Sequence, residues 1–144
     1  MKVELRADSF DPYAELAGHQ RQDLPAGTHG AASCFIGSAR DFNDGRRVQD
    51  LVLEHYPGMT DRFVERIAAQ AMAQWPLLDV LVLHRYGKVA LGEAIVLIGV
   101  WSAHRGAAFE ACRFIIEELK HEAPFWKKEG GGQGRRWVEA NTQA

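Results

Sequence analysis

Cationic residues at the two ends of one predicted helix are the groups in this sequence whose types and spacing could do chemistry. His104 and Arg105 open an alanine-rich segment after an apolar, strand-like run, and Lys120 falls in its last predicted turn. A continuous helix would hold Arg105 and Lys120 roughly 22 Å apart along its axis. One small ligand cannot bridge that distance within a single chain. If both residues touch one substrate, two copies of the chain must build the site.

Lys120 and Lys127 form the first candidate pair for catalysis. Pro124 ends the predicted helix between them, so the chain can turn and bring both ammonium groups toward one pocket. Mutual repulsion and partial burial would then leave one amine neutral near pH 7, able to act as a base or a nucleophile. The plainer interpretation is a solvated lysine stabilised by the helix dipole, and spacing alone favours it.

Anion binding is the chemistry that His104 and Arg105 would suit. Cations at a helix N-terminus face the positive end of the dipole. A phosphate there would offset this repulsion and accept hydrogen bonds from the free backbone N–H groups. An exposed first turn whose arginine pairs with an acidic neighbour is an equal alternative. Arg40 ends a predicted strand and begins a polar loop, where binding residues often lie, although a lone loop arginine is more often merely solvated.

Length and composition narrow the class of protein. With 144 residues the chain is expected to form a single domain, 1–144, and its net charge of -2 with scattered basic residues argues against nucleic acid as a partner. The apolar run from Ala94 to Trp101 is too short to cross a membrane, and the charged N-terminal residues predict no export signal. A cytoplasmic protein is therefore expected.

Cysteine and histidine spacings give little support to a metal site. Cys34 and Cys112 lack CxxC spacing, and we expect reduced core thiols, with a persulfide-carrying role as the alternative. His55 and His84 lie on predicted strands and are expected to be packed or edge residues. Without HxxxH, CxxC or clustered carboxylates, we expect no metal and no cofactor.

The hydrophobic pattern predicts an α+β fold with helices packed on a mixed sheet. Asp11 and Pro12 begin a short helix, Thr60 caps a second one, and the third runs from about 103 to 122. Strands are predicted at 3–7, 31–38, 48–56, 77–86, 93–102 and 136–140. Several connections between strands are too short for crossover helices, so a mixed sheet is favoured over a doubly wound parallel one.

Four motifs that occur in consistent order carry a resemblance to a known family. They are LEHYPGM at 53–59, SAHR at 102–105, APFWKKE at 123–129 and RWVEA at 136–140. Together they resemble the large, catalytic subunit of molybdopterin synthase over about residues 30–140. The glycine-rich stretch 130–134 and the short end after Asn141 depart from the usual charged linker and longer tail of that family.

The resemblance implies an α/β-hammerhead fold and a homodimer at the centre of a heterotetramer. It also implies a small ubiquitin-like sulfur-carrier subunit at each end, whose C-terminal Gly-Gly thiocarboxylate enters the pocket. The implied activity is a sulfurtransferase of molybdenum cofactor biosynthesis, which converts cyclic pyranopterin monophosphate to molybdopterin. Two sulfur transfers would form the dithiolene. The alternative function is a non-catalytic anion-binding or scaffold subunit that keeps the fold and performs no transfer.

The resemblance also assigns site residues by position. Lys120 and Lys127 match the catalytic lysines, the first as base or transient covalent partner, the second as stabiliser of the thiocarboxylate and of developing anions. The segments that match its substrate-contacting parts contain Ser38, Ala39, Arg40, His104, Arg105, Lys128 and Glu129. Arg136 is expected to help line the same pocket, and His104 and Arg105 would come from the second chain.

Overall fold

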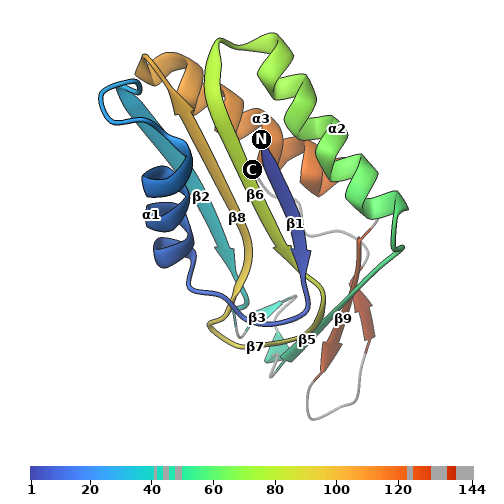
Figure 1. The fold of residues 1–144 in the computed structure, drawn as a ribbon. Coiled ribbons are helices and arrows are strands. Elements are labelled where there is room, and N and C mark those ends of the chain that lie inside the picture. The colour runs from blue at the N-terminus through green and yellow to red at the C-terminus, as the bar shows by residue number, and fades with distance from the viewer. Residues whose placement is uncertain (41, 44–45, 48–49, 123–124, 131–135, 139–144) are drawn as a thin grey trace.

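The computed structural model describes residues 1–40, 42–43, 46–47, 50–122, 125–130 and 136–138, with side chains for 1–40 and 51–121. Single helices separate runs of one or more strands along the chain (Figure 1). In chain order the elements are β1 (Lys2–Arg6), α1 (Pro12–Asp23), β2 (Ala31–Ser38), β3 (Phe42–Asn43), β4 (Arg46–Arg47), β5 (Asp50–His55), α2 (Met59–Gln74), β6 (Leu77–Arg85), β7 (Gly87–Ala90), β8 (Ala94–Ser102), α3 (Arg105–Glu122), β9 (Phe125–Gly130) and β10 (Arg136–Val138).

A mixed four-stranded sheet in the order β1-β6-β8-β2 forms the larger part of the molecule. β1 pairs parallel to β6, whereas β6–β8 and β8–β2 are antiparallel. β6 and β8 are buried over most of their length, as their nearly continuous apolar sequences require of strands covered on both faces. The predicted mixed sheet and the α+β class are confirmed.

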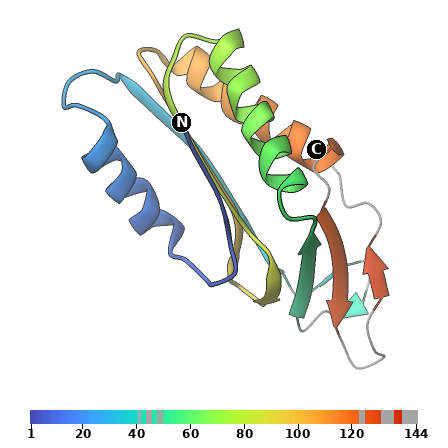
Figure 2. The same ribbon diagram turned by 45° about the vertical axis from the view of Figure 1, so that its right-hand side comes forward.

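Helices cover both faces of this sheet (Figure 2). α2 and α3 pack on the face that carries Val80, Val82 and Ile98, which confirms the predicted packing of helices on the sheet. α1 lies on the other face, where Leu16 packs against a cluster that includes Trp101. A Cβ atom at residue 99 of β8 would lie 2.8 Å from Leu16 Cδ2, so glycine is needed for this close approach.

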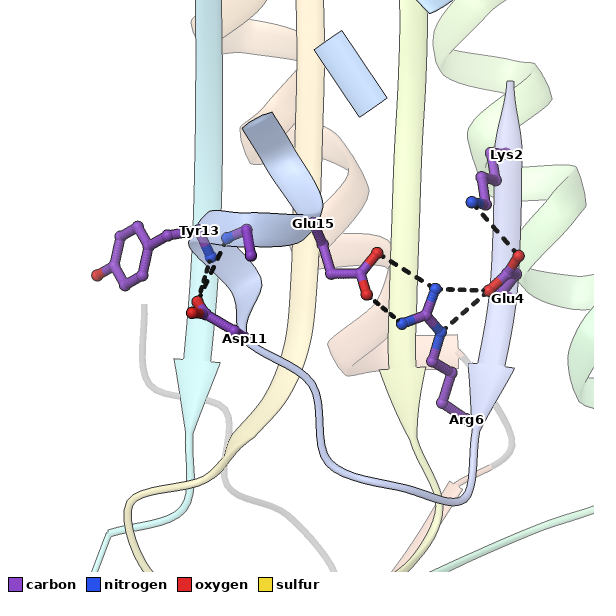
Figure 3. Close-up of polar contacts among 7 residues, drawn as sticks. Lys2, Glu4, Arg6, Asp11, Tyr13 and Glu15 are labelled. Carbon is purple, nitrogen blue, oxygen red and sulfur yellow. Dashed lines mark hydrogen bonds and ion pairs between the residues drawn. The ribbon is translucent and has the colours of Figure 1, made fainter. Parts of the chain in front are cut away.

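Polar contacts fix α1 at its start (Figure 3). Asp11 Oδ1 accepts hydrogen bonds from the backbone N–H groups of Tyr13 and Ala14, at 3.0 and 3.3 Å, which confirms the predicted N-cap. Arg6 of β1 lies between two carboxylates, with Nη1 2.5 Å from Glu15 Oε1 and Nη2 2.8 Å from Glu4 Oε2 (Figure 3). The first strand and the first helix are thereby tied together.

A buried pair joins the far end of α1 to β6. His19 Nε2 lies 2.7 Å from Asp79 Oδ2, and both residues are buried. Burial opposes ionisation of Asp79, but hydrogen bonds from the Met1 amino group, His19 and the Val80 N–H outweigh it and lower the pKa of this carboxyl. This polar contact supplements the small apolar face that α1 offers to the sheet.

The second sheet is antiparallel and has the order β10-β9-β5-β7, and β3 and β4 form a separate two-stranded pair. Among its described side chains, Leu51, Leu53 and Val89 are buried, and they cluster with Ala39 from the chain just after β2. Ile95 packs against this cluster and against the main core. The two sheets therefore meet at the end of the molecule where β2 ends and β8 begins (Figure 1).

Several local expectations were wrong. Thr60 does not cap α2: the helix begins at Met59 after Gly58, which has a φ of 82°, and the Thr60 hydroxyl accepts the Tyr56 N–H instead. Cys34 is exposed on the edge strand β2, so only Cys112 is the expected core thiol, and burial raises its pKa to about 11.

No helix within the described residues is long and apolar enough to cross a membrane.

Candidate functional site

The segment Ser38–Ala39–Arg40 leaves the end of β2 at the junction of the two sheets. The pairing of β2 with β8 shifts register between Gly37 and Ser38, an irregularity that re-aims the chain. Ala39 is buried in the smaller core, whereas the side chains of Ser38 and Arg40 are exposed. The predicted polar loop after Arg40 contains the short strands β3 and β4, whose side chains lie outside the described residues. The junction thus presents Ser38 and Arg40 at the surface.

Lys120 lies near this same end of the sheet. α3 is one continuous helix, as predicted, and it packs on β8 and β2 while running back from the end of β8. Its length of about 27 Å nearly matches that of β8, so its C-terminal turn reaches the start of β8. Leu119 packs in the core that contains Val96, the residue paired with Gly37, and Lys120 itself is exposed. Within the described part of the chain, the Lys120 side chain is therefore open to solvent.

The backbone register of β9 brings Lys127 toward the junction as well. Lys127 pairs with Leu53, whose side chain clusters with Ala39. Lys128 pairs with Val52 and with Trp137 of β10, and Arg136 pairs with Glu129. The side chains of Lys127, Lys128, Glu129 and Arg136 lie outside the described residues, as does the whole of the glycine-rich stretch 131–135.

His104 and Arg105 stand at the opposite end of the sheet. Ala31 at the start of β2 pairs with Ser102 at the end of β8, and α3 begins three residues later. The Ser102 hydroxyl donates a hydrogen bond to the His104 carbonyl, and the side chains of His104 and Arg105 are exposed. The length of β2 separates this end from Ser38 by roughly 23 Å. Within one chain, the predicted site residues therefore form two groups at opposite ends.

Two further charged residues at the junction were not found from the sequence. Arg85 ends β6 with only 4% of its side chain exposed, and its Nη1 lies 3.7 Å from Glu93 Oε1. A basic residue at the end of a strand and an acidic one in a turn are ordinary surface residues by pattern.

No group of three or more His, Cys, Asp or Glu residues in the described part of the chain could hold a metal ion. His55 and His84 are packed, the first against the ring of Tyr86 and the second buried.

Comparison with known proteins gives these groups a context. The model of the MoaE protein family matches residues 6–122. A molybdopterin synthase catalytic subunit from Pseudomonas aeruginosa is 49% identical over 139 residues, which are 96% of this chain and 91% of that protein. The structure of a molybdopterin biosynthesis MoaE protein from Burkholderia ambifaria is 40% identical, with a TM-score of 0.80, and the match covers 99% of this chain and 92% of that one.

A more distant structure shares the fold. It is a protein–protein complex of subunits 1 and 2 of the molybdopterin-converting factor from Helicobacter pylori, with a TM-score of 0.80 at 23% identity, covering 95% of this chain and 90% of that one. The extent of the family match and the identity to the Pseudomonas protein, over nearly the full length of both chains, settle the assignment. This chain belongs to the MoaE protein family.

Proposed function

We propose that this chain is the catalytic subunit of a molybdopterin synthase, a sulfurtransferase that converts cyclic pyranopterin monophosphate to molybdopterin. The observation that carries the proposal is the near full-length match to a relative named as that catalytic subunit. The sulfur donor would be the C-terminal thiocarboxylate of a small carrier subunit. The complex of two subunits described for the Helicobacter relative supports a partner of this kind.

The geometry of a single chain supports a site shared between two copies. Ser38, Arg40 and Lys120 lie at one end of the sheet, whereas His104 and Arg105 lie roughly 23 Å away along β2. A two-fold homodimer would allow His104 and Arg105 of a second copy to complete the site of the first. With a carrier subunit bound to each copy, the assembly would be a heterotetramer.

Charge complementarity supports the assignment of roles. The substrate is a phosphate ester, and Arg40 with His104 and Arg105 of the second copy would hold its phosphate and pterin through charge-assisted hydrogen bonds. Ala39 would contribute through its backbone, and Ser38, Lys128, Glu129 and Arg136 would line the pocket.

The two lysines would carry the chemistry. Lys120 would act as the base or transient covalent partner once substrate and carrier remove its amine from water. Lys127 would stabilise the thiocarboxylate and the oxyanions that develop as sulfur leaves the carrier. The two roles need opposite protonation states: Lys120 must be a neutral amine to act as base or covalent partner, whereas Lys127 must keep its positive charge beside the negatively charged tail.

Incubation with a thiocarboxylated carrier and cyclic pyranopterin monophosphate, followed by assay of the dithiolene product, tests the function. Lys120→Ala should reduce product formation at least ~100-fold, because it removes a group that acts on the reacting atoms. Arg113→Ala is the matched control, since Arg113 is an exposed cation of the same helix. Carrier binding and dimer formation should be unchanged in both variants. Full product yield from Lys120→Ala would favour a non-catalytic scaffold instead.

We also propose that residues 1–144 act as one domain in the cytoplasm. Ile95 packs against both the main core and the smaller core, which supports a single folding unit. Both cysteines are free thiols in the structure, which suits a reducing compartment.

A further inference from the structure

The turn between β7 and β8 holds the backbone of Ala39. The Gly92 N–H donates to the Ala39 carbonyl at 2.7 Å, and the Ala39 N–H donates to the Glu93 carbonyl at 3.0 Å. These two bonds hold the chain just after the last residue of β2. Because Ala39 is only 3% exposed and lies between Ser38 and Arg40, they also fix where those two exposed side chains begin.

The side chain of Glu93 braces this turn from within. Its Oε1 accepts the Ala90 N–H at 2.7 Å and lies 3.7 Å from Arg85 Nη1. The other end of the same guanidinium donates from Nη2 to the Lys88 carbonyl at 2.8 Å. Arg85 therefore contacts β7 through Lys88 and the turn before β8 through Glu93.

The buried guanidinium depends on Glu93. Arg85 is 3% exposed, and its Nε and Nη1 atoms find no hydrogen-bond acceptor among the residues that the structure describes. Glu93 is the carboxylate paired with it among the described side chains. A buried cation that loses its counter-charge is strongly destabilised, so the turn between β7 and β8 must shift to resolvate the guanidinium when the carboxylate is removed. That shift would be passed to Ala39 through the two backbone hydrogen bonds.

We propose that Arg85 and Glu93 are positioning residues for the substrate-contacting segment 38–40. The Arg85 guanidinium contacts the Glu93 carboxylate, this carboxylate accepts a hydrogen bond within the turn between β7 and β8, and the turn is hydrogen-bonded to the Ala39 backbone. Neither residue has to touch the substrate. The inference rests on the proposed function, because it takes Ser38 and Arg40 as part of the pterin site. Displacement of a binding group by about 1 Å can cost up to ~100-fold in rate, so a small shift of the turn between β7 and β8 is measurable.

Steady-state kinetics with each substrate varied in turn gives the first test. Glu93→Ala removes both side-chain contacts and should raise KM for cyclic pyranopterin monophosphate about tenfold, with KM for the carrier and kcat within about twofold of wild type. Glu93→Gln keeps an acceptor for the Ala90 N–H and should restore part of the loss. Glu117→Ala is the control, because Glu117 pairs with an arginine too, at 3.2 Å on the surface of α3, and it should change nothing.

Amide hydrogen exchange measured by NMR gives the second test, and it needs no substrate. The Ala39 N–H should exchange about tenfold faster in Glu93→Ala than in wild type, whereas amides in the centre of β8 should keep their protection. An unchanged KM for the pterin, or unchanged protection of Ala39, overturns the inference. A uniform loss of protection in Glu93→Ala would indicate general destabilisation, and the milder Glu93→Gln then decides by the same two measurements.

The two proposals fail separately. A wild-type protein that makes no product with the carrier and the pterin contradicts the proposed function, while the exchange measurement still judges whether Glu93 holds Ala39. An active wild type whose Glu93 variants behave like Glu117→Ala contradicts only the inference.

Discussion

Complementation between two inactive variants is the sharpest test of a site built by two chains. Lys120→Ala and Arg105→Ala should each abolish turnover in a homodimer. In a heterodimer of the two variants, one site loses both residues and the other keeps both. The heterodimer should therefore recover about half of the wild-type activity per dimer, because the two sites of a symmetric dimer are equivalent.

The structure gives the reason to expect recovery. α3 is continuous from Arg105 to Glu122, so Arg105 and Lys120 lie roughly 22 Å apart along its axis and cannot reach one small substrate from the same chain. All of the substituted side chains are exposed, so each variant should keep the wild-type free energy of unfolding to within ~0.5 kcal/mol.

A second heterodimer provides the control. Arg40 and Lys120 lie at the same end of one chain, so Arg40→Ala and Lys120→Ala should damage both sites of their heterodimer and restore nothing. The assay is dithiolene formation by heterodimers purified through two different affinity tags. Recovery in the Arg40 pair with none in the Arg105 pair would refute the arrangement, as would a fully active protein that remains monomeric.

Three predictions concern stability and reactivity. Asp79→Asn should lower the free energy of unfolding at about pH 7 and weaken the dependence of that free energy on acid pH. The reason is that the pKa of Asp79 lies below its ordinary 3.8, so the ionised carboxylate stabilises the fold fully above pH 3.8, and this stabilisation is lost as the pH falls through the lower folded pKa. Denaturant titrations at several pH values measure the effect. Asp11→Ala should cost about 1 kcal/mol of unfolding free energy by removing the N-cap of α1, whereas Asp11→Asn should keep most of it, by the same titration. At about pH 8, iodoacetamide should label exposed Cys34 and spare Cys112, because burial raises the pKa of Cys112 to about 11. Mass spectrometry measures the labelling. A similar rate of labelling at both cysteines would contradict the packing of α3.

The sequence pattern was sufficient where burial follows a regular period. The nearly continuous apolar runs of β6 and β8 predicted both strands, and the 3.6-residue spacing of apolar residues predicted α2 and α3. The start of α1 was readable because Asp11 and Pro12 act through local bonds. In each of these elements the information lies within one stretch of chain.

Features that depend on distant partners were missed. β7 has only four residues, and its pairing with β5 joins segments more than thirty residues apart, which no local pattern reports. Cys34 was taken as a core residue because a cysteine inside an apolar strand is usually buried, yet β2 is an edge strand and one of its faces is partly open. Thr60 was predicted to cap α2, but the N-cap residue is Gly58, because a glycine at positive φ can begin a turn without a side-chain cap.

The candidate site shows the same division. Arg105 and Lys120 could be named because the ends of a helix are visible in a sequence, and their separation follows from counting residues. Arg85 and Glu93 could not be named from the sequence. Their proposed role depends on a turn whose residues Gly92 and Glu93 form backbone hydrogen bonds with Ala39, more than fifty residues earlier in the chain. The roles of Lys127, Lys128, Glu129 and Arg136 remain predictions, since only their backbone register is described.

The position of the two cationic groups has a consequence for the assembly. β8 and α3 have nearly equal length, and together they form a rigid body with one group at each end. A two-fold axis that joins Arg105 of one copy to Lys120 of the other must also join the reverse pair, so a closed dimer contains two complete sites and no unused half. Each site then lies beside the smaller sheet of one copy.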